Sequence, residues 1–78
     1  MKKIQILGTG CPKCNQLEKN AREAVERTGA TYEIEKVSDI AEITKFGVMI
    51  TPALAIDGQV KTSGKVLSAE EIAELIKQ

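Results

Sequence analysis

The stretch Cys11-Pro12-Lys13-Cys14 contains both cysteines of the 78-residue chain and lies where a short apolar run gives way to a helical pattern. Residues 3–7 (KIQIL) are typical of a short β-strand. Pro12 fits the first position of a helix, because its fixed φ suits the turn and its missing N–H leaves no intrahelical bond unmade. The sequence therefore places the two thiols at a strand-to-helix junction, with Cys11 as the N-cap. The helical pattern beyond it is carried by Cys14, Leu17, Ala21, Ala24 and Val25.

This position predicts unequal chemistry for the two thiols. The Cys11 sulfur faces free N–H groups and the positive end of the helix dipole, so we expect its pKa to fall below the free value of about 8.5. Lys13 adds a cationic group whose effect is weakened by salt. Cys14 shares a helix face with Cys11 at i+3, within disulfide reach, and faces the sheet, so burial should raise its pKa. Cys11 is the candidate attacking thiol, and Cys14 the candidate resolving thiol.

Other interpretations use the same cysteine pair. A structural disulfide across so short a loop would restrict little unfolded-state entropy. A closed zinc site needs three or four protein ligands, whereas this chain has no His and no second cysteine pair. Two unrelated buried cysteines would leave the intervening proline unexplained. A soft monovalent metal needs only the two thiolates, and this alternative stays open.

Composition and charge narrow the classes of function. The chain is expected to form one small domain over residues 1–78, near the size at which a single core gives marginal stability. Its 11 basic residues balance 11 acidic ones, and it has one Tyr, one Phe and no Trp, so neither nucleic acid nor an anionic membrane is an expected partner. The N-terminal apolar run is too short for a signal peptide or a membrane span. We therefore expect a cytoplasmic protein, in which a C-x-x-C is more often catalytic or metal-binding than structural.

Periodicity predicts two helices and an edge strand in the first two thirds of the chain. The first helix should run over residues 12–28 with Gly29 as a left-handed stop. Residues 31–37 alternate polar and apolar side chains, as in a strand with one solvated face. Ser38 or Asp39 can cap a second helix, and its predicted buried stripe consists of Ile40, Ile43 and Phe46.

The last third of the chain predicts a hairpin and a final helix. Residues 53–56 (ALAI) form a continuous apolar run typical of a central strand. Asp57-Gly58 is a strong hairpin signal that joins it to a strand over residues 59–62. A capping box from Ser68 to Glu71 then opens a helix whose predicted buried face consists of Ile72, Leu75 and Ile76.

The element order is therefore strand, helix, strand, helix, strand, strand, helix, which predicts an α/β fold with a mixed four-stranded sheet. Crossovers of this length favour parallel directions for the first three strands, and the hairpin adds an antiparallel edge. Apolar content puts the strands at 3–7 and 53–56 in the centre. The expected spatial order is 31–37, 3–7, 53–56, 59–62.

A C-x-x-C after the first strand, a Thr-Pro before a central strand and an Asp-Gly hairpin together resemble the thioredoxin and glutaredoxin superfamily, and most closely its small prokaryotic redox-active disulfide proteins. The resemblance spans nearly the whole chain. It implies a thioredoxin-like fold and a thiol–disulfide oxidoreductase that exchanges a Cys11–Cys14 disulfide with disulfide-containing proteins. It also implies that Pro52 is a cis-proline whose loop, with Thr51, lies against the disulfide and binds substrate backbone. Pro12 and Lys13 are further candidate substrate contacts.

Departures from the family pattern bear on the reductant. Glutaredoxins bind glutathione through a Gly-Gly pair and an acidic residue after the hairpin, whereas residues 62–68 here read TSGKVLS and lack the acid. The sequence thus favours a thioredoxin-reductase-like reductant over glutathione, with no cofactor beyond the redox-active disulfide. A monomer or weak dimer is expected, and the apolar group Val48, Met49 and Ile50 is expected to be exposed as substrate surface or as a dimer contact.

Two other functional classes share part of this pattern. A copper-type metallochaperone also has a C-x-x-C after its first strand, but resembles a strand-helix-strand-strand-helix-strand order with Met before the motif, whereas this chain has Gly8-Thr9-Gly10 there and ends in a predicted helix. A pure protein-binding module would leave both thiols without a role. Soft-metal carriage by Cys11 and Cys14 is therefore the alternative to redox exchange.

Overall fold

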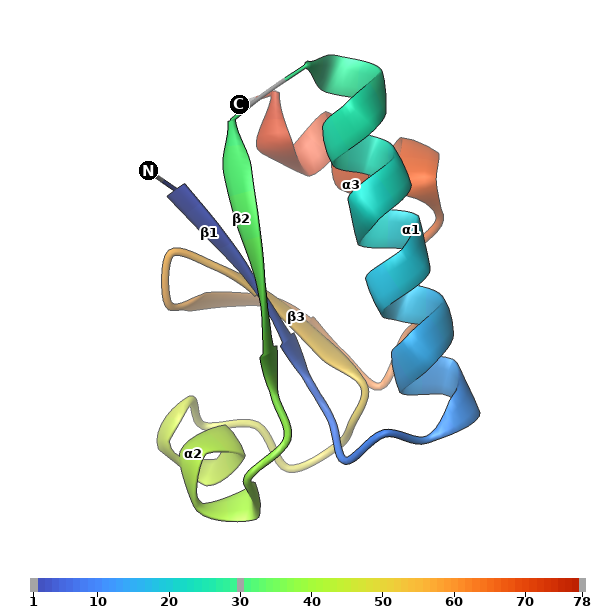
Figure 1. Cartoon of the computed structure of the whole chain (residues 1–78). Coiled ribbons are helices and arrows are strands. Elements are labelled where there is room, and N and C mark those ends of the chain that lie inside the picture. The colour runs from blue at the N-terminus through green and yellow to red at the C-terminus, as the bar shows by residue number, and fades with distance from the viewer. Residues whose placement is uncertain (1, 30, 78) are drawn as a thin grey trace.

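The computed structural model describes residues 2–29 and 31–77. It forms a four-stranded sheet in the spatial order β2-β1-β3-β4, with three helices connected as βαβαββα (Figure 1). This confirms the mixed α/β fold and the strand order expected from the sequence. The elements are β1 (Lys2–Leu7), α1 (Pro12–Thr28), β2 (Tyr32–Val37), α2 (Ile40–Lys45), β3 (Ala53–Ile56), β4 (Gln59–Ser63) and α3 (Ala69–Ile76).

Strand directions differ from the expectation at β3. β2 runs parallel to β1, but β3 runs antiparallel to β1, so the prediction of three parallel strands is wrong. The connection between β2 and β3 does not cross the sheet. Six helical residues span about 9 Å, whereas a six-residue strand spans about 20 Å, so α2 alone does not return the chain to the starting end of the sheet. It lies instead at the end where β2 finishes, and β3 starts from there (Figure 1).

The two faces of the sheet carry separate apolar clusters. α1 and α3 pack together on one face, where Ile4, Leu17, Leu54 and Ile72 are fully buried. The smaller cluster, on the side of α2, contains Leu7, Ile43, Val48, Ala53 and Ala55. A strand buried on both faces reads as a continuous apolar run, which explains the sequence of β3.

Helix ends follow the local sequence closely. Pro12 opens α1, and Gly29 closes it with a left-handed φ of 65°. Ser68 caps α3 with the complete capping box to Glu71. Within the described part of the chain, every helix is too short or too polar to span a membrane.

The interior of α2 departs from its predicted stripe. Asp39 is the N-cap, and its side chain accepts a hydrogen bond from the Ala41 N–H at 2.8 Å. Ile43 is buried and Phe46 is partly buried, but Ile40 is 70% exposed, so its predicted burial is wrong. Within α2, Ile43 is the buried side chain that packs on the sheet.

Candidate active site

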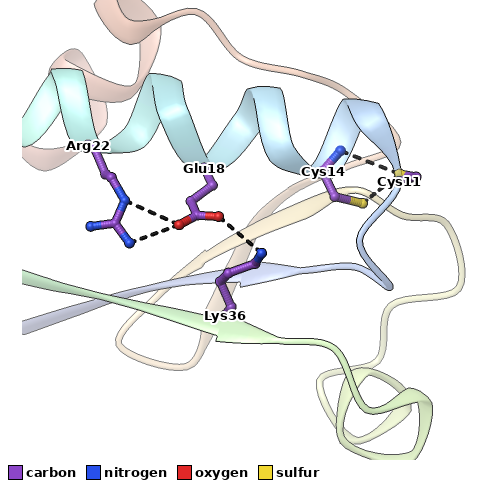
Figure 2. Close-up of polar contacts among 5 residues, drawn as sticks. All are labelled: Cys11, Cys14, Glu18, Arg22 and Lys36. Atoms are coloured by element: carbon purple, nitrogen blue, oxygen red, sulfur yellow. Dashed lines mark hydrogen bonds and ion pairs between the residues drawn. The ribbon is translucent and has the colours of Figure 1, made fainter.

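The two cysteines lie at the N-terminus of α1, as Figure 2 shows. Cys11 is the N-cap in an extended conformation (φ −67°, ψ 162°), and its sulfur accepts a hydrogen bond from the Cys14 N–H at 3.4 Å. The two sulfurs are 2.7 Å apart and hydrogen-bonded, and both cysteines are free thiols. An S–S bond can therefore form between them without rearrangement of the helix.

The environments of the two thiols are unequal in the predicted sense. Cys11 is partly exposed, and the hydrogen bond from the Cys14 side chain, followed by the one from the Cys14 N–H, lowers its pKa. Cys14 is 1% exposed, and burial, followed by its hydrogen bond to Cys11, raises its pKa. As pH rises, the thiolate therefore forms first on Cys11, which is also the sulfur that a partner can reach.

The β1–α1 loop holds the motif against the sheet. The Gly8 N–H donates to the Val37 carbonyl at 3.0 Å, and this extends the β1–β2 pairing past Leu7. Gly10 has a φ of 94°, a conformation that favours glycine. The chain thus leaves the strand in a fixed direction and reaches the N-cap of α1 three residues after Gly8.

Thr51 and Pro52 come from the segment that precedes β3. A β-carbon placed on Gly8 would lie 3.1 Å from the Cys14 Cβ and 3.9 Å from the Thr51 Cβ, so Thr51 is close to the buried cysteine. The Thr51–Pro52 peptide bond is cis, and Pro52 is buried. The Gly64 N–H donates to the Pro52 carbonyl at 2.8 Å, which ties this segment to the end of β4. Nothing in the sequence around Gly64 indicates that contact.

An open cavity of about 380 Å³ adjoins this site. Thr9, Met49 and Thr51 are among its lining residues, and Met49 is 97% exposed. Ile50 is 63% exposed, but Val48 is 6% exposed and packs on the sheet, so the expectation of an exposed Val48 is wrong. The remaining lining residues are Ile40, Ile43, Thr44 and Val48.

The other two candidate residues, Pro12 and Lys13, are exposed beside Cys11 on the first turn of α1. Both lie where a molecule that approaches the Cys11 sulfur would meet them. Across residues 2–29 and 31–77, no three His, Cys, Asp or Glu side chains gather in a group that could hold a metal ion.

One turn beyond Cys14, a cluster of charges ties α1 to the edge strand (Figure 2). Glu18 accepts hydrogen bonds from Arg22 at 2.8 and 3.2 Å and pairs with Lys36 of β2 at 3.2 Å. The hydrogen bond from Arg22, and then that from Lys36, lowers the Glu18 pKa. The i, i+4 spacing of Glu18 and Arg22 is visible in the sequence, but the contact with β2 depends on the fold.

Comparison with known proteins gives consistent matches over nearly the whole chain. A family model described as "Thioredoxin domain" matches residues 2–77. A protein of Methanothermobacter thermautotrophicus named "Thioredoxin" is 49% identical over 76 residues, which cover 97% of this chain and 99% of that protein. A protein of Methanocaldococcus jannaschii, also named "Thioredoxin", is 49% identical over 74 residues, which cover 95% of this chain and 85% of that protein.

Proposed function

Because this chain belongs to the thioredoxin family and is a thiol–disulfide oxidoreductase, we propose that Cys11 and Cys14 are the two thiols that carry out its exchange with protein disulfides. The observation that carries this proposal is the unequal state of two sulfurs 2.7 Å apart. One is partly exposed with a lowered pKa, and the other is buried with a raised pKa. These properties are those expected of an attacking thiolate at Cys11 and a resolving thiol at Cys14.

The exchange takes place in two displacements. The Cys11 thiolate attacks one sulfur of the partner's disulfide, so a Cys11–partner bond forms, the partner's S–S bond breaks, and the second partner sulfur leaves as a thiolate that takes up a proton. Cys14 then loses its proton and attacks the Cys11 sulfur. The Cys11–Cys14 bond forms, the mixed disulfide breaks, and the first partner sulfur leaves as a thiolate. The partner gains two electrons and this protein loses two.

We propose an extended protein segment as the substrate. The candidate contacts are Thr51 with Pro52, since Thr51 lies close to Cys14, and Pro12 with Lys13, which follow Cys11 on the first turn of α1. Among the described residues that line the adjoining cavity, none is charged. The chain lacks the acidic residue expected of a glutathione site after the hairpin, so the proposed reductant is a thioredoxin-reductase-like protein. A cytoplasmic location is proposed because reducing compartments favour catalytic over structural cysteine pairs.

The proposal is tested with the single cysteine variants and an oxidised model protein. Cys14→Ser should accumulate a mixed disulfide through Cys11, whereas Cys11→Ser should form almost none, and the wild type should reduce the model disulfide to completion. Equal trapping by both variants would contradict the assignment of roles. One-to-one binding of monovalent copper in preference to a competing thiol, together with no disulfide reduction by the wild type, would favour the soft-metal carrier instead.

A further inference from the structure

Gly8 and Gly10 lie in the same loop, but they are glycines for different physical reasons. Gly10 has a left-handed φ of 94°, and a β-carbon built on it would meet nothing within 4 Å. Gly8 is buried and its φ lies outside the left-handed region, so a left-handed backbone does not explain the glycine. What Gly8 lacks is space, because a β-carbon there would overlap the Cys14 sulfur.

Gly8 and Cys14 are both held in place by the surrounding structure. The Gly8 N–H is bonded to the Val37 carbonyl at 3.0 Å, which anchors the glycine to the edge strand. Cys14 belongs to the first turn of α1, and its side chain is 1% exposed and hydrogen-bonded to Cys11. The Cys14 sulfur is therefore buried and cannot move into solvent as an exposed side chain could. A methyl group on Gly8 would have to displace it inside the site.

We propose that Gly8 is a positioning residue for the resolving half of the exchange, because its missing side chain provides the space in which the Cys14 sulfur lies 2.7 Å behind Cys11. This inference rests on the proposed roles of the two thiols. In the second displacement, the Cys14 sulfur forms the bond to Cys11 while the bond from Cys11 to the partner breaks. That step depends directly on where the Cys14 sulfur lies, whereas the first displacement depends on it only through the hydrogen bond that Cys14 gives to Cys11.

The proposal predicts that Gly8→Ala slows the second displacement much more than the first. With an oxidised model protein and acid quenching, formation of the mixed disulfide should slow by no more than severalfold, through the weakened hydrogen bond to Cys11. Its resolution should slow by roughly 10- to 100-fold, since small misplacements of reacting atoms have effects of this size. The mixed disulfide should then accumulate although both cysteines are present. A protein damaged only in stability would not separate the two rates in this way.

Gly29→Ala is the matched control. It adds the same methyl group at the far end of α1, at a φ of 65°, where no described atom beyond the chain neighbours lies within 4 Å, so it perturbs the helix without contacting a cysteine. Both rates should stay at the wild-type values in Gly29→Ala. If Gly8→Ala resolves the mixed disulfide as fast as Gly29→Ala does, Gly8 has no positioning role.

A second measurement keeps the inference testable if Gly8→Ala folds poorly. Overpacking should lower its Tm by roughly 5 to 20 °C. In a Cys14→Ala background most of that loss should disappear, because the sulfur is gone and the contacts that remain are 3.1 Å to the β-carbon of residue 14 and an ordinary 3.9 Å to the Thr51 Cβ. An equal Tm loss in both backgrounds would overturn the inference.

Failure of the proposed function has a different signature. If the wild type reduces no protein disulfide, the roles of the thiols are wrong, whatever Gly8→Ala does. The claim that Gly8 leaves space for the Cys14 sulfur can still be tested in the reduced proteins by site-specific alkylation. Displacement of the Cys14 sulfur should raise its labelling rate severalfold in Gly8→Ala relative to Gly29→Ala, and unchanged labelling would contradict it.

Discussion

Substitution of Gly64 by Ala tests how the end of β4 supports the Thr51–Pro52 segment. Gly64 has a φ of 76°, and its N–H donates to the Pro52 carbonyl at 2.8 Å. A β-carbon on it would lie 2.9 Å from the Ile50 Cγ2 and 3.7 Å from the Ile50 Cβ. The substitution therefore strains the backbone and also pushes on the residue just before Thr51.

The expected cost has two parts. A left-handed conformation costs an L-residue about 1–2 kcal/mol. Ile50 is 63% exposed, so its side chain can turn away from the new methyl group, and an off-rotamer side chain costs about 0.5–1.5 kcal/mol. We expect Gly64→Ala to lower the free energy of unfolding by about 1.5–3.5 kcal/mol. The total free energy of unfolding of a 78-residue chain is about 4–12 kcal/mol, so the variant should stay folded in water.

Gly58→Ala, at the opposite end of β4, measures the backbone contribution to this free-energy cost alone. Gly58 has a φ of 83°, nothing lies within 4 Å of its β-carbon position, and its N–H can keep the bond to the Gln5 Oε1. Urea unfolding should therefore show a loss of about 1–2 kcal/mol for Gly58→Ala and a larger loss for Gly64→Ala. Addition of Ile50→Ala should recover the difference in the Gly64 variant.

The same variants separate a stability effect from an effect on the site. Gly64→Ala should slow reduction of a protein disulfide severalfold, while alkylation of Cys11 by a small reagent stays at the wild-type rate because α1 is untouched. Gly58→Ala should change neither rate. Equal unfolding losses for the two glycine variants, with no recovery on adding Ile50→Ala, would refute the reasoning about the Ile50 contact.

Three further outcomes follow from the described contacts. Alkylation of the reduced wild type at neutral pH should label Cys11 much faster than Cys14, because hydrogen bonds lower the Cys11 pKa and burial raises the Cys14 pKa. Site-resolved mass spectrometry measures the two rates, and faster labelling of Cys14 would contradict this. Ser68→Ala should lower the free energy of unfolding by about 1 kcal/mol through loss of the N-cap, measured by urea unfolding. The lowered Glu18 pKa means that its pairing stabilises the fold fully above the unfolded value of about 4.3 and is lost as pH falls through the folded value. Because Arg22 is 59% exposed, this amounts to under about 1 kcal/mol, and Glu18→Gln should flatten the acid limb of the stability curve accordingly.

Local signals predicted the elements that frame the site. Pro12 and Gly29 bound α1 because the first requires no N–H and the second adopts a left-handed φ, and both constraints act within a few residues. The hairpin at Asp57-Gly58 and the capping box of α3 were predictable for the same reason. The unequal pKa directions of the two cysteines also followed from helix position, since the N-cap and the third helical residue differ in burial.

Features that depend on how elements approach one another were not visible in the sequence. β3 starts at the end of the sheet where β2 finishes, and a periodic pattern does not reveal whether the segment between two strands crosses the sheet. Ile40 matched the apolar spacing of Ile43 but lies off the contact with the sheet, and Val48 is buried by that same contact. Gly8 gave no signal beyond a glycine next to a motif, because its constraint arises only when α1 docks against the end of β1.

Cys11 is both the N-cap of α1 and the candidate attacking sulfur, which links the redox state to the folding of the helix. A thiolate accepts the Cys14 N–H as a charge-assisted hydrogen bond, whereas a sulfur engaged in a disulfide is neutral and a weaker acceptor. Each exchange would thus alter the capping of a helix whose later turns contribute Leu17 and Ala21 to the core. The first turn of α1 should fray more readily when Cys11 is bonded to another sulfur, so amide exchange at Cys14 becomes a local indicator of oxidation.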